Sequence, residues 1–393
     1  MKRLWLSAAA LLACPVLAHA DAVTDWNLKA AEMTIAGRLA PHDSWTVMAT
    51  TNVAASDALS AISGQSPFIA KLDKTPDAAP EAAIAAANQT VLLMMIPSQK
   101  EAIDRTYNAV IAQLPEKGRE SGIKLGAAAA QAVISARKVD KESVEDYRPV
   151  TTPGKYVPTV VPAAFTASSR KCWVLEKVDQ FRPGPPPELT SDVWARDYNE
   201  IKSLGAKLKS SRTPEQTDIA KFWETTNAII YLPVAHAAAN KDLAYNARFM
   251  AVLSMAADDA MSAVFDAKYT YYFWRPFTAI RNGDMDGNDA TERDASWLPF
   301  IDTPMHPEYP CAHCILSGTI GGVIKATAGN NIKLSTTSPS LPGKTRSWNT
   351  ADEFMQEVMS ARIYDGVHYR NSTEVGNAMG QKIGEFAAKK YLN

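Results

Sequence analysis

The feature that most constrains the fold of this chain is a helical spacing of apolar residues, repeated along most of its length. In the N-terminal third, alanine-rich segments carry apolar residues three and four positions apart, which places them on one face of a helix. These segments cover residues 26–39, 45–62, 81–96, 101–114 and 121–138. Ser98 and Glu101 have the spacing of a capping box for the fourth segment. No segment alternates apolar and polar residues as a strand does, so the pattern predicts an all-α protein.

Prolines interrupt this pattern in the middle of the chain. Eight prolines stand between residues 149 and 187, and because proline lacks the amide hydrogen that a helix interior needs, no long helix can form there. The helical spacing returns beyond this stretch, and no internal repeat of fixed length is present. We therefore predict two packed helical bundles, residues 21–148 and residues 191–393, joined by a proline-rich loop or linker over residues 149–190.

The second bundle has a clear helix start. Thr213, Pro214 and Gln216 supply an N-cap, a first-turn proline and a capping-box partner. Further helical segments are predicted at residues 243–274, 311–327, 351–364 and 372–391. His236 stands alone on an apolar helical segment, where we expect a core residue with a satisfied ring rather than a ligand.

Residues 1–20 have the pattern of a secretory signal. Lys2 and Arg3 precede an apolar run over residues 4–17, followed by a small-x-small triplet that ends at Ala20. Lipidation at Cys14 and retention as an anchor fit this pattern less well. No later stretch reaches the ~20 uninterrupted apolar residues of a spanning helix. We therefore expect export, cleavage after Ala20, and a soluble mature protein in a periplasm or outside the cell.

Composition restricts the class of partner. The chain has 41 basic and 42 acidic side chains, for a net charge of -1, so we expect no nucleic-acid partner. With 46% hydrophobic and 21% charged residues it is an ordinary globular chain rather than a disordered one. Four cysteines in 393 residues are too few for a disulfide scaffold. A small-molecule ligand is the expected partner, and the oligomeric state is left open.

Three short segments carry candidate chemistry, and the first holds two cations. Lys268 and Arg275 lie seven positions apart at the end of the segment 243–274, so on a helix they would project from nearly one face. Pro276 would end that helix. The aromatic residues between the two cations are unlike a solvated face, and buried cations require an anion.

The second segment is a proline-flanked histidine. Pro310 can precede a helix but not occupy its interior, so the amides of Cys311, Ala312 and His313 are predicted to be unpaired donors at a helix N-terminus. Such a position binds anions. His313 could act there as an acid or a base, the alternative being a structural histidine.

The third segment contains Arg362, Gly366 and His368. Gly366 can end a helix in the left-handed conformation, which would turn the chain so that Arg362 and His368 face one pocket. Asn371 and Glu374 are predicted to cap the final helix. Taken together, the three segments indicate a site for a tetrahedral oxyanion.

The series K-x(6)-R-P, P-x-x-H and R-x(3)-G-x-H, in this order, resembles the superfamily of vanadium-dependent haloperoxidases and type-2 phosphatidic acid phosphatases, which includes bacterial acid phosphatases. The longer texts "DAKYTYYFWRPFTAIRNGDMDGNDAT" and "TPMHPEYPCAHC" are similar to the bacterial haloperoxidase-like branch. The resemblance covers about residues 240–390. It implies a vanadium haloperoxidase-like fold with the oxyanion pocket in the C-terminal bundle.

The resemblance also implies roles for individual residues. Vanadate or phosphate would be held by three cations and a helix-terminal amide, namely Lys268, Arg275, Arg362 and Ala312. His368 would be the vanadium ligand in one chemistry and the phosphorylated nucleophile in the other. His313 would deprotonate peroxide or protonate a leaving alcohol. Phe265 and His306 fall where haloperoxidases line the halide side of the pocket, although core packing or loop anchoring explains each equally well.

The chain departs from the family where Ser-Gly-His-Ser is usual. Here the residues are Cys311, Ala312, His313 and Cys314, and a thiol is a weaker donor than a hydroxyl. Cys311 and Cys314 are candidates for a disulfide with each other or with Cys172. Three unreacted thiols are the alternative, and the sequence leaves the connectivity open.

An acidic turn offers a second, weaker metal site. Asp284 and Asp286 are spaced like the start of a calcium loop, but Arg293 stands where the closing glutamate belongs. A plain turn is the favoured interpretation, and calcium near Asp284 and Asp286 is the alternative.

Three functions remain open from the sequence. The leading hypothesis is a vanadate-dependent haloperoxidase-type enzyme that uses peroxide to oxidise halide. The second is a phosphoester hydrolase, of acid phosphatase or phosphatidic acid phosphatase type, acting through a phosphohistidine at His368. The third is a non-catalytic relative that only binds an oxyanion.

Overall fold

The computed structural model describes residues 21–137, 149–158, 160–239 and 241–392, so the predicted signal peptide lies outside the described residues. The N-terminal helices are α1 (Ala22–Ala36), α2 (Pro41–Ser63), α3 (Pro80–Met95), α4 (Lys100–Gln113) and α5 (Arg119–Ala136), with the short η1 (Pro97–Gln99) before α4. The later helices are α6 (Asp192–Leu204), α7 (Pro214–Phe222), α8 (Ala228–His236), α9 (Leu243–Tyr271), α10 (Pro276–Arg281), α11 (Ala312–Ala328), α12 (Ala351–Tyr364) and α13 (Arg370–Tyr391). The prediction of an all-α fold is confirmed.

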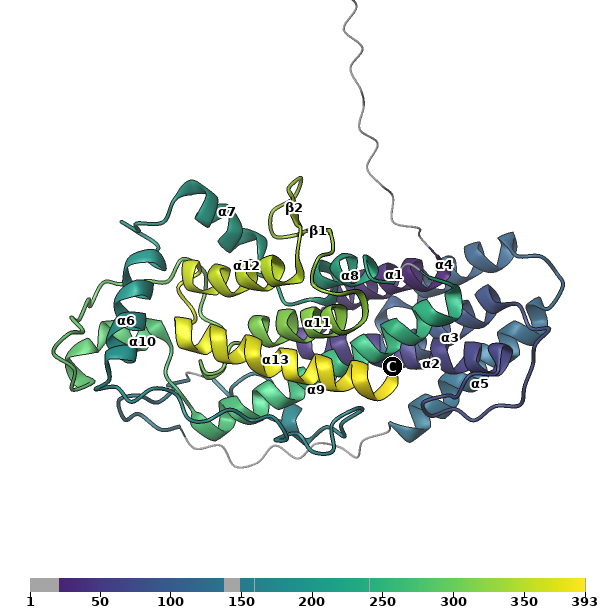
Figure 1. Cartoon of the computed structure of the whole chain (residues 1–393), viewed down its shortest axis with the longest axis horizontal. Coiled ribbons are helices and arrows are strands. Elements are labelled where there is room, and N and C mark those ends of the chain that lie inside the picture. Colours follow the sequence, from purple (N-terminus) through teal and green to yellow (C-terminus); the bar gives the residue numbers. More distant parts are fainter. Residues whose placement is uncertain (1–20, 138–148, 159, 240, 393) are drawn as a thin grey trace, which may run out of the picture.

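The long helix α9 connects the two ends of the molecule. Figure 1 shows α1 to α5 at one end, α6, α7, α10 and α12 at the other, and α9 running between them beside α11 and α13. α9 packs on α2 as well as on α11 and α13. One cluster of buried apolar side chains extends from Val23 on α1 to Ala387 on α13. The boundaries of the two bundles stay a prediction.

Small residues let α11 and α13 approach closely. A Cβ atom added to Gly380 on α13 would lie only 2.2 Å from the carbonyl oxygen of Ile315 on α11. At the start of both helices, a Cβ atom on Gly376 would lie 2.6 Å from the carbonyl oxygen of Cys311. Because neither position has room for a side chain, the backbone that follows His368 is held against the N-terminus of α11.

The sequence patterns did not predict α6 or the pair of strands β1 and β2. α6 begins at the N-cap Ser191 and buries Trp194, Tyr198 and Ile201, spaced four and three residues apart. Their helical spacing was the missed signal. Among the described residues, the only strands are β1 (Leu334–Thr337) and β2 (Thr345–Trp348), an antiparallel pair too short to show alternation in the sequence.

Helix capping was predicted correctly in one place and wrongly in two. Thr213 and Gln216 form the expected capping box of α7. α4 begins instead after Gln99, with no side-chain cap, because residues 97–99 form η1. α13 begins after Tyr369, also without a side-chain cap, and the amide of Asn371 donates to Asp197.

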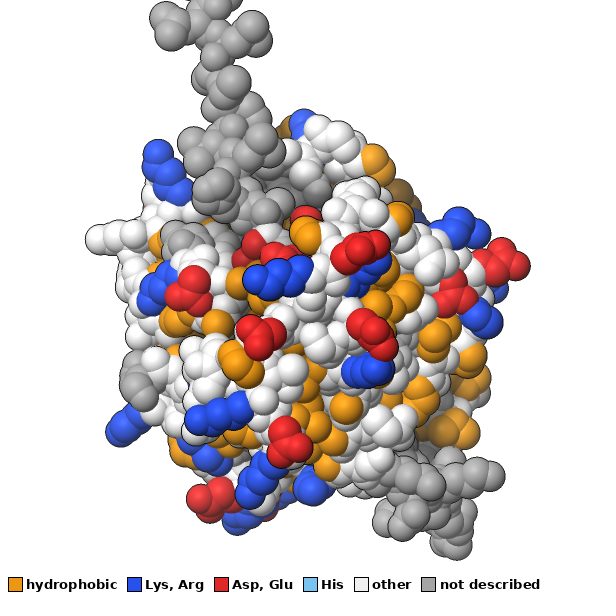
Figure 2. All heavy atoms as spheres, turned by 90° about the vertical axis from the view of Figure 1, so that its right-hand side faces the viewer, with side chains coloured by type: hydrophobic (Ala, Val, Ile, Leu, Met, Phe, Trp, Pro, Cys, Tyr) orange, Lys and Arg blue, Asp and Glu red, His pale blue; other side chains and the backbone are white. Residues whose placement is uncertain are grey.

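The proline-rich stretch forms no α-helix. Within the described part of residues 149–187 the only helical element is η2 (Ala167–Ser169), as predicted. No helix in the described residues has the length and apolar character needed to cross a membrane. Figure 2 shows acidic and basic side chains interspersed on the face at the end that carries α2 to α5.

Candidate oxyanion site

Lys268 and Arg275 are both buried, but they do not share a helix. α9 ends at Tyr271, and Tyr272 adopts the left-handed conformation with φ 54°. Arg275 is the extended N-cap residue of α10, so Pro276 begins that helix instead of ending α9. The predicted common helix face was therefore wrong. The two side chains, 0% and 1% exposed, still meet because the turn brings Arg275 back beside Lys268.

Backbone carbonyl groups around the site hold these two cations. Lys268 Nζ donates to the carbonyl oxygens of Pro307 and Glu308 at 2.9 and 2.8 Å. Arg275 Nε donates to the carbonyl of His306 at 2.9 Å, and Nη1 to that of Val367 at 2.8 Å. Burial, and then the charge of Arg275, hold the pKa of Lys268 well below its usual value. Burial also lowers the pKa of Arg275, to about 10. The two cations destabilise each other, and a bound anion would relieve this repulsion.

Arg362 enters the same region from the last turn of α12. Its Nη1 donates to the carbonyl of Trp223 at 2.9 Å and forms an ion pair with Asp365. Its Nε has no partner among the described residues, although the side chain is only 1% exposed. Burial raises the pKa of Asp365 to about 7. Gly366 has φ 80°, the left-handed turn that was predicted, and it directs the chain back towards Arg275.

His368 lies between Arg275 and Glu308. Its Nδ1 is 2.8 Å from Glu308 Oε1, and its Nε2 is 3.3 Å from Arg275 Nη1. Because a guanidinium can only donate, Nε2 must accept in this contact, so Nδ1 carries the proton and donates to Glu308. Glu308 Oε1 also accepts from the amide of Tyr369 at 3.1 Å. Burial raises the pKa of Glu308 to about 7 and holds that of His368 well below its usual value.

Glu308 and Asp365 are site residues that sequence reasoning missed. Both side chains are fully buried, with 0% exposure, and each faces one of the predicted cations or histidines. A signal was available, because both acids lie within the short segments that carry His313 and His368. An acidic residue beside buried cations is more often a partner than a solvated charge.

His313 lies in the first turn of α11. Its Nε2 is 3.3 Å from the carbonyl oxygen of Glu224, which can only accept, so Nε2 carries the proton and Nδ1 retains a lone pair. Burial, followed by the charge of Arg362, holds the pKa of His313 well below its usual value. In this tautomer Nδ1 is the ring atom with a free lone pair for a proton.

The cysteines that flank His313 are joined. Cys311 and Cys314 form a disulfide in the structure, while Cys172 is free and lies on the proline-rich loop against the middle of α9. Cys311 is the N-cap residue, and its amide donates to the carbonyl of Ser372 at 3.2 Å. The prediction of an unpaired amide at Cys311 was therefore wrong. Ala312 and His313 occupy the first turn, where amides have no partner within the helix.

His306 lies beside Arg275, and Phe265 packs against His306. Their ring centroids are 5.2 Å apart in an edge-to-face arrangement. His306 Nδ1 is 3.0 Å from Arg275 Nη2, and burial holds the pKa of His306 well below its usual value. The structure thus brings both predicted pocket-lining residues to the cation cluster.

The acidic turn and His236 lie elsewhere. Asp286 accepts hydrogen bonds from Trp194, Thr291 and the amide of Asn288, and Asp284 pairs with Arg293 at 3.7 Å. Protein groups already engage these carboxylates, and the described residues contain no metal-binding cluster of acids, cysteines and histidines, so the structure does not support the calcium alternative. His236 is a buried core residue as expected, but its Nε2 has no partner among the described residues.

Comparisons with known proteins agree with this geometry. Residues 248–393 match the family model described as the VCPO second helical-bundle domain. The whole structure is similar to a bacterial vanadium-dependent iodoperoxidase, with TM-score 0.77 and 22% identity over 94% of this chain and 95% of that one. The chain has the vanadium haloperoxidase-like fold. The resemblance to this superfamily, inferred from the motifs, is confirmed.

Two further vanadium haloperoxidase structures are similar. They are the apo and holo forms of a bacterial vanadium-dependent chloroperoxidase, each 17% identical, with TM-scores of 0.72 and 0.69. Both matches cover 90% of this chain, and they cover 95% and 93% of those chains. No curated protein sequence matches the chain significantly. All the cations and histidines of the candidate site lie within the segment matched by the vanadium haloperoxidase family model.

Proposed function

We propose that this protein is a vanadate-dependent haloperoxidase-type enzyme, which uses peroxide to oxidise halide. The observation that carries the proposal is the charge balance of the site. The buried cations Lys268, Arg275 and Arg362 face two buried carboxylates, Glu308 and Asp365, which leaves a formal charge of +1 when the histidines are neutral. A buried excess of positive charge favours a bound anion.

The residues present fit a tetrahedral oxyanion. Arg362 Nε is a buried donor without a partner among the described residues, and the amides of Ala312 and His313 in the first turn of α11 add donors that have no partner within the helix. Lys268, Arg275, Arg362 and the amide of Ala312 would hold the anion's oxygen atoms. His368 Nε2 would be the ligand atom, since Glu308 keeps the proton on Nδ1. Vanadate, when bound, supplies an electrophilic centre that activates peroxide.

The remaining site residues would handle the proton and the halide. His313 Nδ1 keeps a lone pair because Nε2 donates to the carbonyl of Glu224, so His313 would accept the proton that peroxide loses on binding. Phe265 and His306 would form the apolar and polar walls beside Arg275 on the halide side. Export after Ala20 would suit the disulfide, because disulfides persist in oxidising compartments.

The same geometry suits a phosphoester hydrolase as the second candidate. His368 Nε2 keeps a lone pair for attack on phosphorus, which is the observation that favours this chemistry. His313 would then donate a proton to the leaving alcohol. The third candidate, a non-catalytic oxyanion-binding protein, needs the cations alone.

Two assays on metal-free protein separate the three functions. The first measures halogenation of an activated dione with vanadate, peroxide and iodide, bromide or chloride. The second measures hydrolysis of an aryl phosphate at acidic pH without vanadate. We expect activity in the first, lost in His368→Ala together with vanadate retention, and kept in the control His236→Gln. Activity only in the second would replace our proposal by the hydrolase. Silence in both with phosphate still bound would support the third function.

A further inference from the structure

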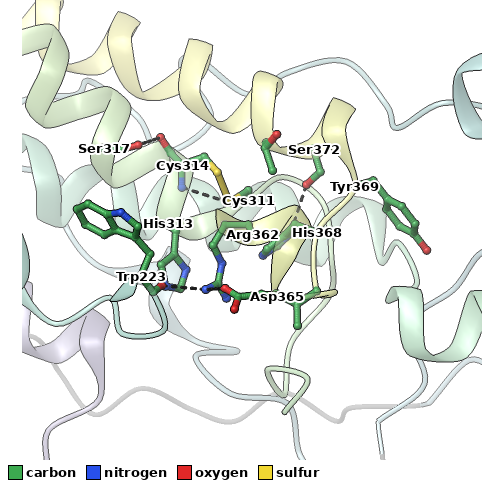
Figure 3. Close-up of a disulfide and its surroundings, with 12 residues drawn as sticks. Trp223, Cys311, His313, Cys314, Ser317, Arg362, Asp365, His368, Tyr369 and Ser372 are labelled. Carbon is green, nitrogen blue, oxygen red and sulfur yellow. Dashed lines mark hydrogen bonds and ion pairs between the residues drawn. A yellow bond between two sulfur atoms is a disulfide. The ribbon is translucent and has the colours of Figure 1, made fainter. Parts of the chain in front are cut away.

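The disulfide at the start of α11 is built into the candidate site. Cys311 is the N-cap residue and Cys314 lies in the first turn, and both side chains are 0% exposed. Figure 3 shows the disulfide with His313, Arg362, His368 and Ser372 around it. A sulfur in a disulfide can neither ionise nor donate a hydrogen bond, so this position is electrically neutral.

The backbone of Cys311 has little freedom to move away from the site. Its amide donates to the carbonyl of Ser372 at 3.2 Å, and Gly376 of α13 lies directly against its carbonyl group. Ser372 Oγ in turn lies 3.5 Å from His368 Nδ1. Cys311 is therefore connected through Ser372 to the segment that carries His368. Breaking the disulfide requires the two sulfur atoms to move apart, and close packing leaves mainly side-chain rotation for this.

The charge of a released thiol would oppose anion binding. Cys311 Sγ accepts a hydrogen bond from the amide of Cys314 at 3.2 Å, so the sulfur lies at the N-terminus of α11, a position that stabilises a thiolate. One thiolate would cancel the formal charge of +1 that Lys268, Arg275 and Arg362 leave over Glu308 and Asp365. The thiolate would then neutralise the cations, so the affinity of the site for an external anion would fall.

We propose that Cys311 and Cys314 form a redox modification site that sets anion binding: the disulfide form binds the oxyanion, and the dithiol form binds it weakly. This rests on the proposed function for its oxidant. Two thiols and one hydrogen peroxide give the disulfide and two water molecules. Each thiol loses a proton and one electron, the S–S bond forms, and the O–O bond breaks. A dithiol reductant reverses the modification by taking up the disulfide itself, with two protein thiols restored.

The test compares the full chain in its two redox states. Protein is reduced with excess dithiol, desalted without oxygen, and its thiols are counted by alkylation and mass spectrometry. Dissociation constants for vanadate and for inorganic phosphate are then measured by calorimetry. We expect reduction to weaken binding of both anions at least tenfold, and one equivalent of peroxide to restore it. Equal affinities in the two states would overturn the proposal.

Variants separate the charge from the constraint. The double variant Cys311→Ala/Cys314→Ala has neither disulfide nor thiolate, so it should bind both anions about as tightly as the oxidised protein and ignore the reductant. Weak binding by this variant would overturn the charge mechanism. Cys172→Ser is the matched control and should respond to reductant as the unaltered protein does. Redox-dependent binding without halogenation would overturn only the proposed function, whereas halogenation with redox-independent binding would overturn only this inference.

Discussion

Two groups of buried charges on α9 and its neighbours differ in how completely protein hydrogen bonds satisfy them. In the middle of α9, Asp259 accepts hydrogen bonds from the consecutive amides of residues 173–175 at 2.7–2.9 Å. Asp57 on α2 does the same for residues 68–70. These carboxylates accept hydrogen bonds from the backbone amides of two loops and so satisfy them. Their role is to attach those loops to the helical core.

The charged groups of the candidate site are not fully satisfied by protein partners. Arg362 Nε, Glu308 Oε2 and Asp365 Oδ1 are buried and have no hydrogen-bond partner among the described residues. Lys268, nine positions after Asp259 on the same helix, is destabilised by burial and by neighbouring cations. An unused buried polar atom costs free energy, so a site that keeps several of them is suited to a ligand rather than to stability.

The largest effect on stability should come from removing a buried carboxylate whose hydrogen bonds are all made by the protein. Asp259→Ala leaves three loop amides without their acceptor, and we expect it to lower the free energy of unfolding by about 3–5 kcal/mol. Urea unfolding followed by circular dichroism measures this, with the exposed Asp289→Ala as the control. Folded Asp259→Ala should still bind vanadate normally. A loss of less than about 1 kcal/mol would show that the loop does not depend on this carboxylate.

The matching change in the site should affect binding rather than folding. Arg362→Ala removes a buried charge-assisted contact, so we expect oxyanion affinity to fall by about 2–4 kcal/mol while helical content stays unchanged. Calorimetry with vanadate and phosphate measures the loss. Arg248→Ala removes an arginine near the start of α9 that donates to the carbonyls of Tyr391 and Ser66, and it serves as the control. Unchanged affinity would place Arg362 outside the site.

His236 tests the comparison from the other side, because it is a buried group with an unpartnered atom that lies outside the site. Burial lowers its pKa to about 4. The unfolded chain, with a pKa near 6.5, binds the proton first, so stability is lost as the pH falls from about 6.5 to 4, by up to about 3 kcal/mol. His236→Leu should remove this part of the pH dependence in urea unfolding at pH 7 and 4.5. Identical pH dependence in both proteins would contradict the assignment.

The smallest predicted effect concerns Glu308, which acts through His368. Glu308→Ala frees Nδ1 of His368 and should weaken vanadate binding by about 10- to 100-fold. Phosphate binding, which needs no bond to His368, should change less. Glu308→Gln keeps an acceptor and should recover part of the vanadate affinity. Equal losses for both anions, without recovery in Glu308→Gln, would indicate a general structural role.

The helices could be predicted from the sequence because apolar spacing is a local property. The predicted segment 351–364 coincides with α12, and the left-handed Gly366 follows from its position after that helix. The missed helix α6 shows the limit of such predictions, because this short amphipathic segment directly follows the proline-rich stretch and was not recognised as a helix.

What the sequence by itself determined is most of the helices and the order of the segments that carry cations and histidines. Only the tertiary structure decided how these groups pair. Arg275 lies outside its predicted helix because α9 ends before Tyr272. Glu308 pairs with His368, and Asp365 pairs with Arg362. The physical reason is that helix formation depends on neighbours three and four positions away, whereas the partner of a buried charge depends on which loops the packed helices bring together.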